Sequence, residues 1–185
     1  MPHRIPAVFL DRDGVLNEAI VRDGHPFAPC RVEDLVILPD AAASCETLRS
    51  MGFALVVVTN QPEIARGSLD PGVLDEMHAV LSGALDLDRI EVCPHIDDDG
   101  CSCRKPAPGL LLGAAKDLAL DLDRSFMVGD RWRDVEAGRR AGCSTIFIDR
   151  YYREQRPASP DVIVSCLAEA VSWISSRQLA RGTMR

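Results

Sequence analysis

The chain has 185 residues, of which 46% are hydrophobic and 26% charged, and this length and balance predict one globular domain with a full hydrophobic core. The formal net charge of −7 argues against a nucleic-acid-binding surface, and no apolar run approaches the ~20 residues that span a bilayer. The N-terminus also lacks the apolar segment of a signal peptide. We therefore expect a cytoplasmic monomer that binds neither nucleic acid nor membrane.

Apolar runs of strand length alternate with segments of helical periodicity along the chain. The runs predict β-strands over residues 7–10, 54–59, 90–93, 126–128, 145–148 and 162–164. The segments between and after them predict helices over residues 41–51, 71–85, 108–118, 134–141 and 166–174. This alternation predicts an α/β fold, with helices on both faces of one parallel sheet. We expect a single domain over residues 1–176 without a large inserted domain, loops over the site between residues 17 and 39, and a frayed tail over residues 177–185.

Two aspartates, Asp11 and Asp13, follow the first predicted strand directly. Side chains two positions apart on a strand point the same way, so both carboxylates can face a crevice at the end of the sheet. Close carboxylates repel each other, and a bound cation or the formation of an aspartyl-phosphate would make use of the pair. Aspartate and glycine are also common in turns, so this motif alone leaves the two interpretations open.

Polar side chains that suit phosphate or metal binding lie at three further places in the chain. Thr59 and Asn60 end the second strand and offer a hydroxyl and an amide to a phosphate, although taken alone they are more often simply a polar loop after a buried strand. Lys105 precedes a helix and can neutralise phosphate charge. Asp130 and Asp134 follow the fourth strand, where an aspartate is also a common helix N-cap. With Asp11 and the backbone carbonyl of Asp13, Asp130 would supply oxygen ligands to Mg²⁺, with Asp134 beside them.

In combination, these motifs resemble those of the haloacid dehalogenase superfamily of phosphatases over nearly the whole chain. The resemblance implies a single Rossmann-like domain in which Asp11 attacks phosphorus to form an aspartyl-phosphate. Asp13 would protonate the leaving oxygen and then accept a proton from the attacking water. Thr59 and Lys105 would stabilise charge on the phosphoryl oxygens, and Mg²⁺ would be bound by Asp11, Asp13 and Asp130.

A cluster of sulfur and nitrogen ligands lies between the third strand and Lys105. The pattern Cys-x-His-x₅-Cys-x-Cys places Cys93, His95, Cys101 and Cys103 within eleven residues, which suits a tetrahedral Zn²⁺ ion. A set of four protein ligands leaves no open position, so this zinc would be structural and would fix the short loop 93–103. Free or disulfide-bonded thiols are the alternative. Four scattered cysteines fit free thiols in a reducing cytosol, namely Cys30, Cys45, Cys143 and Cys166.

This zinc loop is similar to that of two groups within the superfamily, the D,D-heptose 1,7-bisphosphate phosphatases and the histidinol-phosphate phosphatases. Asn17 and the run 64–67 resemble the heptose enzymes, and the resemblance places Arg104 and Arg131 against a second phosphate. It implies hydrolysis of the C7 phosphate of D-glycero-D-manno-heptose 1,7-bisphosphate. Histidinol phosphate or another small phosphorylated metabolite is the alternative substrate. Four residues are predicted to bind the substrate: Asn60, Arg66, Arg104 and Arg131.

The segment Pro62-Glu63 departs from the pattern of these families, which have a small residue and a glycine there. Glu63 adds negative charge near a phosphate site, so it either points away from the site or selects a different leaving group. A zinc-stabilised binding module without activity is a further alternative, although such a module would need neither Asp11 nor Asp13.

Overall fold

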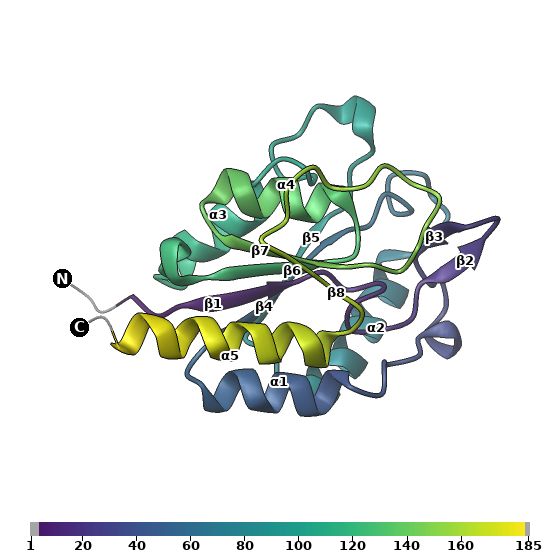
Figure 1. Ribbon diagram of the computed structural model, residues 1–185. Coiled ribbons are helices and arrows are strands. Elements are labelled where there is room, and N and C mark those ends of the chain that lie inside the picture. Colours follow the sequence, from purple (N-terminus) through teal and green to yellow (C-terminus); the bar gives the residue numbers. More distant parts are fainter. Residues whose placement is uncertain (1–3, 184–185) are drawn as a thin grey trace.

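The computed structural model describes residues 4–183, with side chains through residue 180. A six-stranded parallel sheet in the order β5-β4-β1-β6-β7-β8 forms its centre (Figure 1). The strands are β1 (Ala7–Leu10), β4 (Ala54–Asn60), β5 (Arg89–Cys93), β6 (Phe126–Gly129), β7 (Ser144–Ile148) and β8 (Val162–Val164). The strand β1 lies between β4 and β6, with Phe9 in register with Val56 on one side and Met127 on the other. The central strands are continuous apolar runs because both faces of a parallel sheet are buried.

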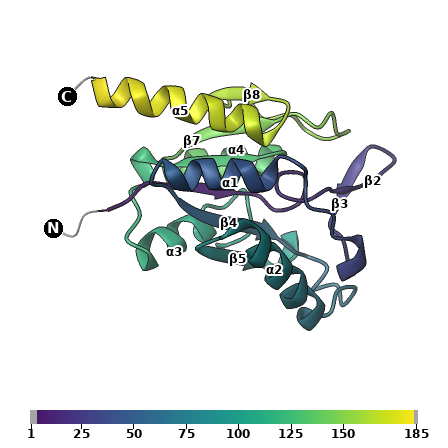
Figure 2. The same ribbon diagram turned by 90° about the horizontal axis from the view of Figure 1, so that it is seen from below.

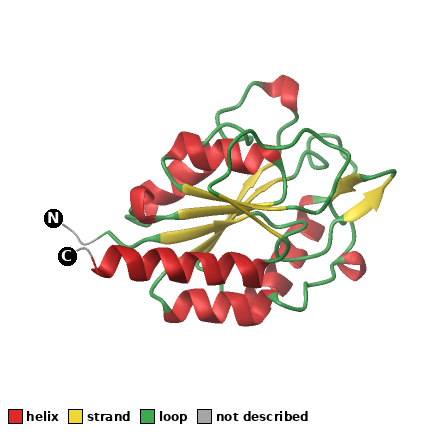
Figure 3. Ribbon diagram, viewed as in Figure 1, coloured by secondary structure: helices red, strands yellow, loops and turns green. Residues whose placement is uncertain are grey.

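Five helices cover the two faces of the sheet, as Figures 2 and 3 show. They are α1 (Ala41–Ser50), α2 (Pro71–Leu85), α3 (Gly109–Asp117), α4 (Trp132–Ala141) and α5 (Leu167–Thr183). On one face, Leu10 belongs to a core cluster with side chains of α1, α2 and α5. On the other face, Phe9 belongs to a cluster with side chains of α3 and α4. The predicted α/β fold with helices on both faces is therefore confirmed.

The segment between β1 and α1 holds a small hairpin where we expected only loops. Its strands, β2 (Ile20–Arg22) and β3 (His25–Phe27), are antiparallel and join at a turn in which Asp23 and Gly24 have φ values of 51° and 82°. Positive φ values at both central residues are typical of the turns that join two-residue β-hairpins. The carbonyl of Gly24 accepts a hydrogen bond of 2.8 Å from the Arg153 backbone, which fixes the hairpin beside the loop that follows β7.

The C-terminal helix is longer than the sequence indicates. The helix α5 continues to Thr183, so residues 177–183 are helical where we expected a frayed tail, while residues 184–185 lie outside the described part. Besides its apolar side chains in the core, further contacts hold the helix against the rest of the fold. The Trp173 ring lies edge-on to Phe126 at 6.0 Å, and the Gln178 side chain donates a hydrogen bond of 3.1 Å to the Met51 carbonyl after α1.

Three 3-10 helices complete the described elements: η1 (Val32–Asp34), η2 (Asp97–Asp99) and η3 (Leu122–Arg124). Of these, η2 lies within the predicted zinc loop, which projects above the sheet beside α4 in Figure 1. Across residues 4–183, no helix has the combination of length and apolar character that crossing a membrane requires.

Candidate active site

The motif residues meet in one pocket at the carboxyl ends of the strands. The pocket encloses about 320 Å³ and is lined by the strand-end motifs, the β2–β3 hairpin and the zinc loop. The predicted site residues that line it are Asp11, Asp13, Thr59, Asn60, Arg66, Arg104, Lys105, Asp130, Arg131 and Asp134. Parallel strands bring their carboxyl ends to the same edge of the sheet, which is why residues more than a hundred positions apart in sequence share this pocket.

Lys105 forms the centre of the pocket floor. Its Nζ lies 2.8 Å from Asp11 Oδ1 and 2.6 Å from Asp134 Oδ1, and it donates a further hydrogen bond of 2.7 Å to the Val58 carbonyl. Only 2% of the side chain is exposed. Burial by itself would lower the pKa of Lys105, but the two carboxylates outweigh this and raise it above its ordinary value. The lysine is therefore a fixed positive charge beside Asp11.

Three carboxylates could share a metal ion at this floor. Asp11, Asp130 and Asp134 each offer an oxygen, and these oxygens lie within 4.8 Å of one another. Burial and the charge of Asp134 raise the pKa of Asp11 to about 6, and burial together with Asp11 raises the pKa of Asp130 well above its usual range. A divalent cation would offset this repulsion.

The hydrogen bonds separate the roles of these carboxylates. Both oxygens of Asp130 are buried and make no hydrogen bond of normal geometry among the described residues, although the Tyr152 hydroxyl is close enough to lower the pKa of Asp130 against the larger effect of burial. Asp134, in contrast, contacts Lys105 through one oxygen and accepts a hydrogen bond of 2.9 Å from the Arg131 backbone through the other. Unpartnered oxygens are the ones that a cation would satisfy, so Asp130 fits a ligand to Mg²⁺, together with Asp11. Asp134 fits the predicted position beside them.

Asp13 is surrounded by donors. Arg12 binds both of its oxygens, at 3.1 Å through Nε and 3.0 Å through Nη2, while Asn17 and Gln61 each donate a hydrogen bond of 2.9 Å. The Arg12 side chain is completely buried, and its third nitrogen lies 3.2 Å from His78 Nε2 on α2. Burial and the Arg12 charge lower the pKa of His78 to about 4, so this histidine is neutral at pH 7. Asp13 is thus held at one fixed place in the pocket.

The end of β4 carries Thr59 and Asn60, which are predicted to bind phosphate and substrate. The Gln61 amide also donates to Thr59 Oγ1 at 2.8 Å, which links Thr59 to Asp13. The Asn60 side chain bonds the Lys105 backbone twice, accepting from its N–H at 3.0 Å and donating to its carbonyl at 3.1 Å. This pair of bonds fixes the segment that carries Lys105 against β4. Asn60 lines the pocket, and its role in substrate binding stays a prediction.

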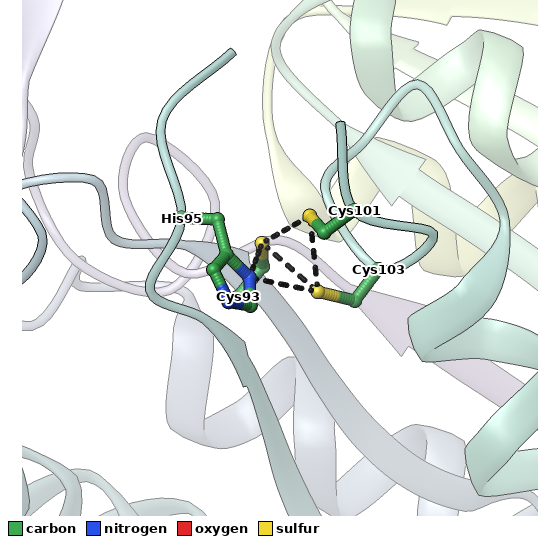
Figure 4. Close-up of side chains that lie close together, drawn as sticks. All are labelled: Cys93, His95, Cys101 and Cys103. Atoms are coloured by element: carbon green, nitrogen blue, oxygen red, sulfur yellow. Dashed lines mark hydrogen bonds between the residues drawn. The ribbon is translucent and has the colours of Figure 1, made fainter. Parts of the chain in front are cut away.

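The four predicted zinc ligands come together at one point, as Figure 4 shows. The sulfur atoms of Cys93, Cys101 and Cys103 lie 3.2–3.6 Å apart, and His95 Nδ1 lies 3.6 Å from Cys93 and 3.3 Å from Cys103. A tetrahedron with zinc–sulfur bonds of about 2.3 Å has edges of about 3.8 Å, so these atoms need only small outward shifts to hold Zn²⁺. All seven cysteines are free, which excludes the disulfide alternative in this structure.

The zinc loop is directly connected to the pocket. The Arg104 backbone N–H lies 3.4 Å from Cys101 Sγ. Burial opposes ionisation of this thiol, but the Arg104 N–H and the neighbouring thiols outweigh burial and lower the pKa of Cys101 to about 7. A low pKa favours the thiolate that zinc binds. Arg104 and Lys105 directly follow Cys103, the last of the four predicted zinc ligands.

Four arginines on the pocket rim are paired with three carboxylates. Arg66 contacts Glu63 at 3.3 Å, and Arg131 contacts Glu154 through both ends of its guanidinium group. Arg104 and Arg133 share Asp97, each at 2.8 Å. The sequence motifs did not single out Arg133 or Glu154: Arg133 lies between two motif residues, and Glu154 reaches the rim from the loop after β7.

Glu63 is one of the residues that line the pocket. Its side chain is 14% exposed, and Oε2 is buried without a hydrogen-bond partner among the described residues. The other oxygen, Oε1, has the single contact with Arg66. This carboxylate can accept a hydrogen bond from a hydroxyl or an ammonium group that enters the pocket.

Comparison with known proteins gives full-length relatives. A family model described as HAD-hydrolase-like matches residues 102–170. The D-glycero-beta-D-manno-heptose-1,7-bisphosphate 7-phosphatase of Yersinia pestis is 34% identical, over 96% of this chain and 99% of its own length. The D-glycero-D-manno-heptose-1,7-bisphosphate 7-phosphatase of Thermosynechococcus vestitus is 36% identical, over 95% of this chain and 98% of its own length.

A solved structure of similar fold is the D,D-heptose 1,7-bisphosphate phosphatase from B. bronchiseptica, complexed with magnesium and phosphate. It has a TM-score of 0.77 and 28% sequence identity, covering 94% of this chain and 99% of its own. Similarity of this extent, together with the pocket in which the predicted motif residues meet, identifies the family. The chain belongs to the haloacid dehalogenase superfamily of phosphatases, in the group of the heptose bisphosphate phosphatases.

Proposed function

We propose that this protein removes the C7 phosphate of D-glycero-D-manno-heptose 1,7-bisphosphate through an aspartyl-phosphate at Asp11. The observation that carries the proposal is the pocket floor, where Lys105 Nζ lies 2.8 Å from Asp11 and both oxygens of Asp130 are buried without a hydrogen bond of normal geometry. This arrangement offers a nucleophilic carboxylate, a fixed positive charge and free metal-binding oxygens in one place.

The side chains divide the reaction between them. Asp11 attacks phosphorus, while Lys105 and Thr59 stabilise the negative charge that develops on the phosphoryl oxygens. Asp13 gives a proton to the leaving sugar oxygen and takes one from the water that later hydrolyses the aspartyl-phosphate. A magnesium ion bound by Asp11, Asp130 and the backbone carbonyl of Asp13 would neutralise the carboxylates and the phosphoryl group.

The zinc site supports this chemistry from outside the pocket. We propose that Zn²⁺ is bound by the four ligands of the loop 93–103, all of which belong to the protein, so that its role is structural. Bound zinc would hold Arg104 and Lys105 in place for the substrate.

The rim favours a substrate with a second negative group. Four arginines face three carboxylates there, which leaves an excess of one positive charge for the distal phosphate of a bisphosphate. Arg66, Arg104 and Arg131 are the predicted contacts. Histidinol phosphate is a second candidate, because the unpartnered Oε2 of Glu63 could receive the amine of its leaving group.

A substrate panel with Mg²⁺ tests the proposal. The panel contains both anomers of D-glycero-D-manno-heptose 1,7-bisphosphate, fructose 1,6-bisphosphate, histidinol phosphate and an aryl phosphate, with phosphate release as the signal. The proposal predicts the highest kcat/KM for a heptose bisphosphate. A preference for histidinol phosphate would keep the chemistry and replace the substrate. No turnover of any compound, with both metals bound, would favour the binding-module alternative.

The proposed compartment is the cytoplasm, where reducing conditions keep zinc-binding thiols available.

A further inference from the structure

The carboxylate of Asp97 is held by two arginines at the rim of the pocket. Arg104 Nε lies 2.8 Å from Asp97 Oδ1, and Arg133 binds the same carboxylate with both ends of its guanidinium group, at 2.8 and 3.3 Å. The two arginines therefore surround a carboxylate that belongs to the protein itself.

The same donors would suit a phosphate. Guanidinium groups bind carboxylates and phosphates with the same paired N–H geometry, and a phosphate brings more charge and more acceptor oxygens. Two arginines around one carboxylate oxygen thus form an anion site of the size and charge that a phosphate monoester needs.

Other contacts hold both arginines in place besides Asp97. Arg104 Nη1 donates a hydrogen bond of 3.0 Å to the His95 carbonyl within the zinc loop. Arg133 lies over the Trp132 ring, 5.1 Å from its centroid, and Nη1 lies 3.4 Å from the Lys105 carbonyl. If the Asp97 carboxylate turned away, these other contacts would still hold both guanidinium groups in position.

Asp97 is also the rim carboxylate that can withdraw most readily. Its side chain is 58% exposed, whereas Glu63 and Glu154 are only 14% and 18% exposed. Asp97 lies in η2, whose three aspartates are all exposed. A side chain that faces solvent loses little packing when it turns away, so the site at Asp97 opens at the lowest cost.

The position of this site fits one substrate with two phosphates. Asp97, Arg104 and Arg133 line the same pocket as Asp11. Lys105 connects the two anion sites: its carbonyl accepts from Arg133, and its Nζ contacts Asp11. The arginine pair and the nucleophile are therefore separated by the length of one lysine residue. A compact sugar with its reacting phosphate at Asp11 would direct its other phosphate toward the arginines.

We propose that Arg104 and Arg133 bind the distal phosphate of a sugar bisphosphate, and that Asp97 occupies this place until the substrate displaces it. The inference rests on the proposed function and adds two elements to it, Arg133 as a substrate-binding residue and Asp97 as an internal competitor. A phosphate dianion displaces the carboxylate, whereas an uncharged distal group does not, so Asp97 lowers the apparent affinity for bisphosphates and leaves that for monophosphates without a distal anion unchanged.

The first test replaces Asp97 by asparagine, with Asp98→Asn as a control that makes the same charge change at the exposed neighbouring position. Steady-state kinetics are measured with heptose 1,7-bisphosphate and with an aryl phosphate that has no distal anion. We expect Asp97→Asn to lower KM for the bisphosphate roughly tenfold relative to Asp98→Asn, the scale of one charged hydrogen bond. The KM for the aryl phosphate should change by the same small factor in both variants.

The second test replaces Arg133 by methionine, which keeps the length of the side chain and removes its charge. We expect KM for the bisphosphate to rise roughly tenfold more than KM for the aryl phosphate, with kcat changed far less than KM. Zinc content and melting temperature are measured for every variant, so that a loosened loop is recognised as such.

Two results would overturn the inference. One is a KM for the bisphosphate that rises or stays constant in Asp97→Asn while zinc content and melting temperature match the wild type, because Asp97 would then only organise the arginines. The other is an equal rise of KM for both substrates in Arg133→Met. If the wild type hydrolyses neither substrate, it is the proposed function that fails.

Discussion

Replacing Lys105 by methionine tests whether the pocket floor depends on one buried positive charge. The lysine is 2% exposed, and its Nζ contacts Asp11 at 2.8 Å, Asp134 at 2.6 Å and the Val58 carbonyl at 2.7 Å. Methionine retains most of the volume, so the loss is mainly electrostatic. Removing one partner of a buried ion pair costs about 3–5 kcal/mol in the free energy of unfolding, and we expect a loss within this range at pH 8.

The pH dependence of this loss follows from the acids that remain. Burial and Asp134 already raise the pKa of Asp11 to about 6, and loss of Lys105 raises it further. A carboxyl group whose folded-state pKa is raised contributes stability that is full below its unfolded pKa, near 3.8, and that disappears as pH rises through the folded pKa. The destabilisation of Lys105→Met is therefore largest at pH 8 and becomes smaller as pH falls toward 5.

Urea unfolding at pH 8 and pH 5 measures this effect, in zinc-loaded protein and in buffer without added Mg²⁺. The control is Lys116→Met on the exposed face of α3, where we expect a change within about 0.5 kcal/mol at both pH values. A Lys105→Met loss below about 1 kcal/mol, or a larger loss that is the same at both pH values, would refute the reasoning.

Three further predictions concern the metals and Glu63. Mg²⁺ should raise the melting temperature of the wild type more at pH 7.5 than at pH 5.5, because protons compete for Asp11 and Asp130, and thermal scans should show no such gain in Asp130→Asn. Cys101→Ser should lower zinc content, measured by elemental analysis, below about half an equivalent, and phosphate release should fall with it; full zinc occupancy in this variant would count against the ligand set. Glu63→Gln should lower the ratio of kcat/KM for histidinol phosphate to kcat/KM for heptose bisphosphate by roughly tenfold, because the amide loses the charge that would attract the amine. Glu76→Gln, at an exposed position, is the control. An unchanged ratio in Glu63→Gln would show that Oε2 does not face the leaving group.

The strand-end motifs could be predicted because they depend on local patterns that a parallel sheet brings together. Asp11 and Asp130 follow continuous apolar strands, and adjacent parallel strands leave little freedom in where their ends lie. The cluster of predicted zinc ligands could also be predicted from the sequence, since the spacing of its members within the short loop 93–103 leaves few other arrangements.

The rest of the site depends on contacts that no local pattern encodes. Glu154 reaches Arg131 from an irregular loop 23 residues away, and Arg12 is buried against His78 of α2, although arginine next to a turn is usually exposed. The β2–β3 hairpin escaped prediction because each strand has three residues, too few to establish an alternation. The extension of α5 is stabilised by α1, which a reading of the polar tail alone does not include.

Phosphate release by Asp11→Asn tests the central claim most directly. The amide keeps the size of the side chain but is a poor nucleophile, so the account predicts that kcat for the heptose bisphosphate falls by roughly a thousandfold or more, with zinc content retained. Retention of wild-type turnover by this variant would contradict the account, because the aspartyl-phosphate could not then form at Asp11.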